Sequence, residues 1–362
     1  MGIDSDFWTG RRVLVTGHTG FKGAWLTLWL RLLGADVSGL APAPPTRPSL
    51  YDLARAGDGV REFAVDVRDA AAVRDAVRSS APEVVLHLAA QPMVRSALAE
   101  PASTYLVNVL GTVNVLDAVR TGGNDVRSVV VVTSDKCYAN PAGADSAGSP
   151  AKRFVEDDPL GGSDPYSSSK ACAELVTAAY RSSYFSSGDG PRVASARAGN
   201  VLGGGDWGED RLVADAVRAV GTREPMRVRN PHAVRPWQHV LNPLSGYLVL
   251  AQECARSSEA ARAWNFGPRP ADERPVSWVL ERLSELWRGE LRWELDAAAH
   301  PPEASHLALD SAAAEAQLGW TPRWNLERAL EMVVAWHDAE RRGEDMRSVT
   351  LAQIQEFVAP GA

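Results

Sequence analysis

Residues 12–23 read RVLVTGHTGFKG, and this stretch decides how the chain folds. Its first five residues have the apolar, β-branched composition of a buried parallel strand, and a helix-forming segment follows. Three glycines separate the two: Gly17, Gly20 and Gly23. Glycine permits a tight turn and lets a phosphate approach the backbone, while the helix N-terminus supplies amide donors and a positive dipole. The stretch therefore predicts a phosphate-binding turn between a strand and a helix.

The alternation of strand and helix continues to about residue 200. Apolar runs recur at 36–41, 61–65, 83–90, 128–135 and 192–200, and helix-like stretches lie at 71–80, 103–120 and 166–184. This pattern predicts an α/β fold with a Rossmann-like, doubly wound parallel sheet, which binds ligands at the carboxyl ends of its strands.

Beyond residue 200 the alternation stops, and the chain becomes richer in Trp, Pro and Arg. We expect a nucleotide-binding domain at 1–199. Residues 200–362 are expected to form mainly a smaller, irregular α/β lobe that binds substrate, with some segments returning to the first domain.

The composition is that of an ordinary globular protein. Of 362 residues, 45% are hydrophobic and 23% are charged, and the net charge is −7. This balance argues against disordered and fibrous classes and against a general binder of nucleic acid or anionic membranes. The three cysteines lack the spacing of a disulfide framework or a zinc site, and no signal sequence or spanning segment is evident. We therefore expect a cytoplasmic protein with no metal, nucleic acid or membrane partner.

Tyr166 and Lys170 are the first catalytic candidates. They lie four residues apart in DPYSSSKACAE and so on one face of the predicted helix. An ammonium group beside a phenol stabilises the phenolate, and lowering a tyrosine pKa from about 10 to about 7 takes roughly 4 kcal/mol. Ser134 lies at the end of the predicted strand SVVVVTSD and would be close to Tyr166. Together the three predict reversible hydride transfer between a secondary alcohol and a nicotinamide cofactor.

The order of glycine turn, strand-end serine and Tyr-x-x-x-Lys resembles the extended short-chain dehydrogenase/reductase family. The resemblance implies NAD as cofactor and the following cofactor-binding residues: Gly17, Gly20, Phe21, Lys22, Gly23, Asp66, Val67, Ala89, Ala90, Asn108, Tyr166 and Lys170. One departure concerns the end of the second strand, where NAD-preferring members carry an acid for the ribose hydroxyls and this chain has Ala41. Lys22 and Arg47 would tolerate a ribose phosphate, so NADP stays an alternative.

Asp135 and Lys136 narrow the predicted reaction. In the sugar-nucleotide 4,6-dehydratases of this family an acid pair follows the hydroxyl residue, and here Lys136 replaces the second acid. With the motifs TSDKCY, RAGNVLGGGDW and RPWQHVLNPLSGYL, the chain resembles the CDP-glucose 4,6-dehydratase branch over nearly its whole length. The resemblance implies a hydro-lyase that oxidises C4 of CDP-glucose, eliminates water across C5 and C6 and reduces C6. Asp135 would act as the acid, and Lys136 as a base or as an electrostatic stabiliser.

The remaining candidates would bind the substrate. Arg211 and Arg235 occupy positions where relatives bind the diphosphate, which a guanidinium can pair with in a bidentate manner, and Asn200 would assist. Gln91 and Arg95 are candidates for the sugar hydroxyls. Two alternatives stay open: another epimerase, dehydratase or ketoreductase for sugar nucleotides, and a non-catalytic NAD(P)-sensing regulator. By family analogy we expect a homodimer or homotetramer.

Overall fold

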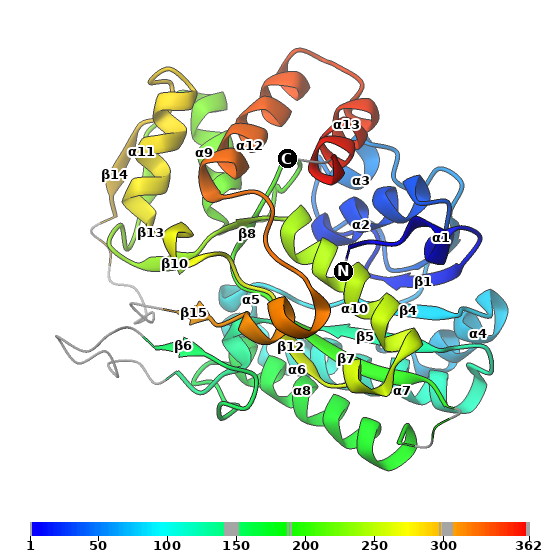
Figure 1. The fold of residues 1–362 in the computed structure, drawn as a ribbon. Helices are drawn as coiled ribbons and strands as arrows, with labels where there is room; N and C mark the ends of the chain where they lie inside the picture. The colour runs from blue at the N-terminus through cyan, green and yellow to red at the C-terminus, as the bar shows by residue number, and fades with distance from the viewer. Residues whose placement is uncertain are drawn as a thin grey trace.

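The computed structural model describes residues 2–140, 152–186, 188, 190–296, 298 and 307–359. Its centre is a seven-stranded parallel sheet in the order β12-β7-β5-β4-β1-β2-β3 (Figure 1). The strands are β1 (Arg12–Thr16), β2 (Asp36–Leu40), β3 (Arg61–Phe63), β4 (Val84–His87), β5 (Ser128–Val132), β7 (Arg192–Arg197) and β12 (Ala263–Asn265). The predicted Rossmann-like α/β fold is confirmed.

Helices cover both faces of this sheet, because alternate residues of its strands are apolar on either side. Leu14 of β1 packs in a core with residues of α4 (Ala70–Ser80) and α7 (Gly111–Gly122), whereas Val13 and Val15 pack in the core on the opposite face of the sheet. The helices α2 (Phe21–Leu32) and α10 (Leu241–Arg256) thus lie on one face, and α4, α7 and α8 (Pro165–Tyr184) on the other (Figure 1).

The helix predicted at 103–120 is interrupted. It consists of α6 (Pro101–Tyr105), a π-helical turn at Leu106–Leu110 and α7. The run Pro101–Gly122 is, within the described residues, the one helix long and apolar enough to cross a membrane by length and composition, and half of its most apolar window is buried inside the protein. A partly buried helix of this kind is also expected in the core of a globular enzyme.

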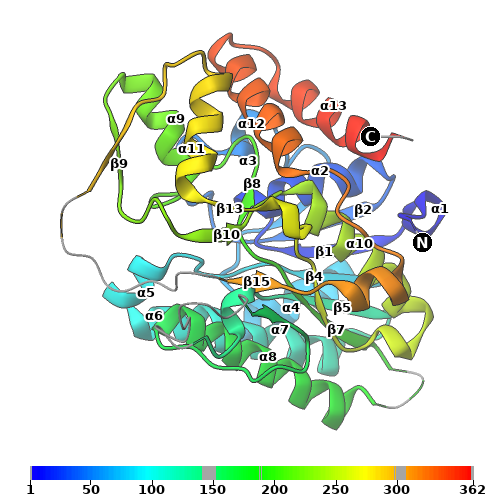
Figure 2. The ribbon, with the colours of Figure 1, turned by 60° about the vertical axis from the view of Figure 1, so that its left-hand side comes forward.

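A second lobe lies above the carboxyl edge of the sheet (Figure 2). Its helices are α9 (Leu212–Thr222), α11 (Val276–Leu286) and α12 (Leu326–Arg341), and two-stranded pairs join β8 (Val201–Leu202) to β11 (Gln238–His239), β9 (Met226–Val228) to β14 (Trp293–Leu295), and β10 (Val234–Pro236) to β13 (Glu273–Pro275). It has an apolar core of its own. Between its segments the chain returns to the central sheet as β12.

The other elements are short or peripheral. They are α1 (Ser5–Trp8), α3 (Leu50–Leu53), α5 (Val94–Ala99), α13 (Met346–Val358), the 3-10 turns Asp135–Cys137, Ser258–Ala260 and Pro270–Asp272, the π-helical turn Ala314–Leu318, and the pair of β6 (Arg153–Phe154) with β15 (Ala308–Leu309). The segment from Tyr138 to Pro165 contains β6 and lies partly outside the described residues.

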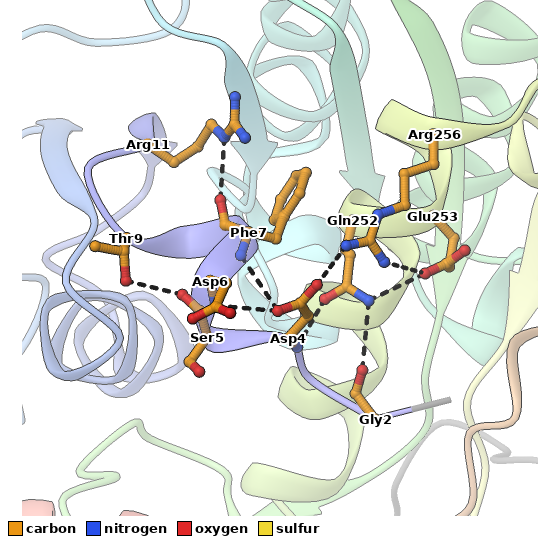
Figure 3. Close-up of polar contacts among 10 residues, drawn as sticks. All are labelled: Gly2, Asp4, Ser5, Asp6, Phe7, Thr9, Arg11, Gln252, Glu253 and Arg256. Carbon is orange, nitrogen blue, oxygen red and sulfur yellow. Dashed lines mark hydrogen bonds and ion pairs between the residues drawn. The ribbon is translucent and has the colours of Figure 1, made fainter.

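The N-terminal segment is fastened to α10 by polar contacts (Figure 3). Asp4 caps α1 by accepting from the amide of Phe7, and its carboxylate also pairs with Arg256. The amide of Asp4 donates to Gln252 Oε1 at 2.9 Å, and the Arg256 guanidinium lies 5.4 Å from the centre of the Phe7 ring. These contacts hold the segment before β1 against the same helix that covers the sheet.

Candidate active site

The glycine turn has the geometry of a phosphate cradle. Gly17 has a φ of +75°, and a Cβ there would lie 2.8 Å from the Cα of Ala89 on the neighbouring strand end. A Cβ on Gly23 would lie 2.1 Å from the carbonyl oxygen of Gly17. Gly20 precedes α2 and offers no side chain to cap the helix, so the amides of the first turn can meet an anion. The cradle fits a dinucleotide pyrophosphate.

A series of buried hydrogen bonds supports the glycine turn. The hydroxyl of Thr16 lies 2.6 Å from His87 Nδ1 and accepts from the amide of Ala89 at 3.2 Å, and His87 Nε2 lies 3.1 Å from the hydroxyl of Thr112. Burial lowers the pKa of His87 to about 3, so the ring is neutral. His87 is therefore a structural residue, and no group of side chains in the described residues could hold a metal ion.

The catalytic loop begins where β5 ends. Ser134 donates from Oγ to Asp135 Oδ1 at 2.9 Å, and its hydroxyl also forms a hydrogen bond with Tyr166. Asp135 is 2% exposed, and its Oδ2 is buried without a hydrogen-bond partner among the described residues. Burial raises the pKa of Asp135 above its usual range, although the adjacent Lys136 acts in the opposite direction. The carboxyl group is thus suited to donate a proton.

Tyr166 and Lys170 face this loop from α8, which begins after the capping residue Asp164. Burial raises the pKa of Tyr166 to about 12, and the hydrogen bond with Ser134 lowers it in part. Burial lowers the pKa of Lys170 to about 8, and its ammonium donates to the carbonyl of Val132 at 3.4 Å. The structure brings together the five predicted catalytic residues: Ser134, Asp135, Lys136, Tyr166 and Lys170. A bound positive charge would be needed to make Tyr166 a base at neutral pH.

Lys22 lies among these groups rather than at the end of β2. The pKa of Lys22 is lowered to about 7, mainly by burial and also by the positive charges of Arg211 and Lys170, while Asp135 acts in the opposite direction. Its side chain therefore belongs with the catalytic centre and the N-terminus of α2. An ammonium group in that place suits the cofactor phosphates or the substrate better than a ribose phosphate.

Asn108 lies on the π-helical turn and is 2% exposed. Its Nδ2 donates to Ser169 Oγ on α8 at 2.8 Å, and its Oδ1 accepts from the amide of Gln91 at 2.8 Å. The side chain of Gln91 in turn donates to Thr104 at 2.9 Å. Asn108 thus connects the segment after β4 to the catalytic helix, and Gln91 is engaged in the same connection.

Asp66 and Val67, predicted to bind the cofactor, follow β3. The carboxylate of Asp66 accepts from Arg68, which holds the pKa of Asp66 below its usual value. Val67 is buried, and its carbonyl accepts from Asn114 of α7 at 2.8 Å. Ala89 and Ala90 follow β4 at the same edge of the sheet.

The candidate substrate residues fall into two groups. Arg235 is 8% exposed and lies close enough to Asp135 to lower its pKa, and Arg211 acts in the same way on Tyr166. Arg211 also pairs with Asp206 at 2.8 Å. Arg95, in contrast, pairs with Asp210 at 3.0 Å, and 48% of its side chain is exposed.

Asn200 lies at the entry to the lobe, where its carbonyl accepts from the amide of Gln238 at 3.2 Å. Trp237 is a core residue with 5% exposure, and its Nε1 donates to the carbonyl of Arg274. Trp207 packs edge to face against Trp336 at 5.6 Å.

Sequence motifs did not single out Glu174, Arg197 or Asp206. Glu174 of α8 and Arg197 of β7 form an ion pair at 2.8 Å, with side chains 3% and 4% exposed. The position of Glu174, four residues after Lys170, was the available signal. Arg197 and Asp206 lie within the quoted motif RAGNVLGGGDW, but only the fold shows that they pair with Glu174 and Arg211.

The chain is similar to known proteins over nearly its whole length. The family model described as GDP-mannose 4,6 dehydratase matches residues 14–333. A CDP-glucose 4,6-dehydratase of Salmonella typhimurium is 45% identical, with 99% of each chain covered. A dTDP-glucose 4,6-dehydratase of Mycolicibacterium smegmatis is 29% identical over 95% of this chain and 99% of that protein.

Solved structures agree with this assignment. The UDP-glucose 4-epimerase of Thermus thermophilus, solved as a complex with NAD, superposes with a TM-score of 0.75 and 26% identity, covering 90% of this chain and 99% of that one. The match of the family model, the identity to a full-length relative and the catalytic groups assembled around Asp135 lead to one conclusion. The chain belongs to the GDP-mannose 4,6-dehydratase family of sugar-nucleotide enzymes.

Proposed function

We propose that this protein is a hydro-lyase that converts CDP-glucose to CDP-4-keto-6-deoxyglucose with NAD, in the biosynthesis of deoxysugars. The observation that carries the proposal is the buried carboxyl group of Asp135 beside Ser134 and Tyr166, in a chain 45% identical to a CDP-glucose 4,6-dehydratase. A simple oxidoreductase needs no such proton donor, whereas the loss of water from a sugar does.

The cradle at Gly17, Gly20 and Gly23 would hold the pyrophosphate of NAD, with Lys22 near the same helix N-terminus. NAD, when bound, supplies the acceptor for the hydride from C4 and returns that hydride to C6. The NAD complex of the Thermus epimerase supports the assignment. The residues after β3 and β4, together with Asn108, would line the rest of the cofactor site.

The oxidation of C4 requires a base at the 4-hydroxyl. Tyr166 is placed for this role because Ser134 shares a hydrogen bond with it and Lys170 follows one helical turn later. Ser134 would orient the sugar oxygen, and the Lys170 ammonium would stabilise the phenolate.

The elimination step requires an acid at C6 and a base at C5. Asp135 would protonate the departing 6-hydroxyl, since its burial favours the neutral carboxylic acid. Lys136, adjacent and half-buried, would remove the C5 proton or stabilise the enolate that forms. The 4-keto group makes the C5 proton acidic, so the oxidation has to come first.

Arg235 and Arg211 would bind the diphosphate, because both lie within electrostatic reach of the catalytic groups. Asn200 would assist them at the entry to the lobe. Gln91 and Arg95 stay candidates for the sugar hydroxyls, although both are engaged with protein partners.

Two other functions are less well supported. An epimerase or ketoreductase would use Ser134, Tyr166 and Lys170 but has no need of a buried proton donor next to them. A regulator that only senses NAD(P) has no need of the catalytic groups that this chain retains.

We further propose a homodimer, or a homotetramer built from it, in the cytoplasm. Large apolar side chains are exposed on α6, the π-helical turn and α8: Tyr105, Leu106, Leu110, Leu175 and Tyr184. Exposed apolar side chains on helices that contact one another suggest a surface that another subunit can cover. The three free cysteines agree with a reducing compartment. Light scattering after size exclusion would report a monomer if this surface stays uncovered.

The deciding experiment offers the enzyme CDP-, dTDP-, UDP- and GDP-linked hexoses and measures the loss of water by mass spectrometry. We expect CDP-glucose to have the highest kcat/KM, by up to about 10⁴-fold if the base edge is read by hydrogen bonds. Equal or faster turnover of dTDP-glucose would overturn the CDP assignment but would leave the dehydration in place.

A further inference from the structure

Tyr166, Lys170 and Glu174 lie four residues apart along one stripe of α8, and all three are buried. Glu174 is 3% exposed, so its charge requires partners inside the protein. Its Oε2 accepts from Arg197 at 2.8 Å and from Ser195 at 2.7 Å. The acid behind Lys170 is therefore held in one position by β7.

The same carboxylate contacts the start of the catalytic loop. Glu174 Oε1 accepts a short hydrogen bond from the hydroxyl of Thr133, the residue directly before Ser134. The amide of Thr133 donates to the carbonyl of Ala196 at 2.9 Å, and that of Asp135 donates to Ala198 at 3.2 Å. The loop is thus tied to the catalytic helix by Glu174 and to β7 by its backbone.

The far end of the loop is fixed by the partner of Glu174. Arg197 Nη1 donates to the hydroxyl of Tyr138 at 2.7 Å, and its guanidinium lies 4.9 Å from the centre of that ring. Tyr138 donates in turn to Asn265 on β12 at 2.7 Å. The ion pair therefore holds both Thr133 and Tyr138, the residues on either side of the segment 134–137.

Among the described residues, four titratable groups interact electrostatically with Lys170. Burial lowers the pKa of Lys170 to about 8, and Glu174 on the same helix and Cys137 on the catalytic loop raise it. On the other elements, Lys22 of α2 and His87 of β4 lie close enough for Lys170 to lower their pKa values. Within the described residues Glu174 is thus the carboxylate that supports the ammonium.

Resting on the dehydration proposed above, we propose that Glu174 is a positioning residue for this reaction. Through Thr133 and Arg197 it fixes the catalytic loop against α8, and its negative charge keeps Lys170 as the ammonium that Tyr166 requires. Neither effect needs contact between Glu174 and the substrate.

The test measures kcat and KM against pH for Glu174→Gln and for the double variant Glu174→Gln/Arg197→Gln. The double variant removes both charges, so it keeps the test open if an unpaired Arg197 prevents the single variant from folding. Without the carboxylate, Lys170 loses its proton more readily. We expect the alkaline fall of kcat to move down by roughly one pH unit, with KM for CDP-glucose nearly unchanged.

Glu156→Gln is the matched control. Glu156 contacts Arg197 through its backbone carbonyl at 2.8 Å, and its charge does not act on Lys170, so the alkaline limb should stay in place. Glu174→Asp keeps the negative charge, so the pH at which kcat falls on the alkaline side should return close to that of the wild type.

A second measurement does not depend on turnover. The ultraviolet difference spectrum between the NAD-loaded protein and its NAD-loaded Tyr166→Phe variant reports the ionisation of Tyr166 when the nicotinamide charge lowers its pKa. This ionisation should shift to higher pH in the Glu174 variants, because Lys170 is then more often neutral. Unchanged phenol titration and an unchanged alkaline limb in the folded double variant would overturn the inference. Failure of the wild-type protein to dehydrate any of the four sugar nucleotides would instead refute the proposed function, while the phenol titration would still test Glu174.

Discussion

The candidate active site and the second lobe differ in how their charged side chains are arranged. On α8 and the loop after β5, the reacting side chains are buried, and Ser134 already contacts both Asp135 and Tyr166. In the lobe, Arg211 pairs with Asp206, and on α5 facing it Arg95 pairs with Asp210. The comparison teaches that the fold brings the candidate catalytic groups together by itself, whereas a ligand of Arg211 or Arg95 would have to compete with the carboxylate that each of them already contacts.

The largest effect is expected at the buried centre. Tyr166→Phe removes the base but keeps the ring, so the variant should fold and bind cofactor while kcat falls by about 10² to 10⁴-fold. Steady-state kinetics with CDP-glucose and a thermal melt would measure both. Turnover near that of the wild type would show that the preassembled centre is not the reacting one.

Asp135→Asn should separate the steps of the reaction. Oxidation at C4 needs no acid at C6, so the variant should accumulate reduced cofactor and a 4-keto-glucose nucleotide while water loss falls by about 10² to 10⁴-fold. Absorbance of the reduced nicotinamide, followed with mass spectrometry of the sugar, would measure it. If oxidation also disappears, Asp135 serves binding or folding rather than proton transfer.

A smaller effect is expected in the lobe. Arg211→Ala should raise KM for CDP-glucose by roughly 10- to 100-fold, because a charge-assisted hydrogen bond contributes about 1.5–3 kcal/mol, and kcat should change less. Arg95→Ala is the comparison, since an exposed ion pair contributes about 0–1 kcal/mol. If Arg211→Ala lowers kcat and leaves KM unchanged, Arg211 acts in the chemical step rather than in substrate binding.

The smallest effect is the pH dependence of the unmodified protein. Lys170, with a pKa lowered to about 8 by burial, carries its charge below that pH and loses it above. Since the phenolate of Tyr166 depends on that charge, kcat should fall to about half near pH 8 and decline further as pH rises. A pH–rate profile measures this directly. A rate that keeps rising to pH 9.5 would contradict the role of Lys170.

The sequence by itself determined the parts that depend on local spacing. Short-range periodicity and the conformations open to glycine predict three features. These are the glycine turn, the alternation of strands and helices along residues 12–200, and the helix that carries Tyr166 and Lys170. The structure confirms the fold and finds the helix at Pro165–Tyr184. The division into a first domain and a substrate lobe stays a prediction, because β12 returns to the central sheet from within the second half.

Other features were decided only by the tertiary structure, because they depend on which residues the fold buries together. Burial raises the pKa of Asp135 and suits the carboxyl group to donate a proton, and this burial is not evident from the sequence. Lys22 reaches the catalytic groups, and Trp237 enters a core, through packing between elements far apart in the chain. The pairing of Glu174 with Arg197 joins α8 to β7, and no local pattern encodes a contact between two elements that only the closed sheet brings together.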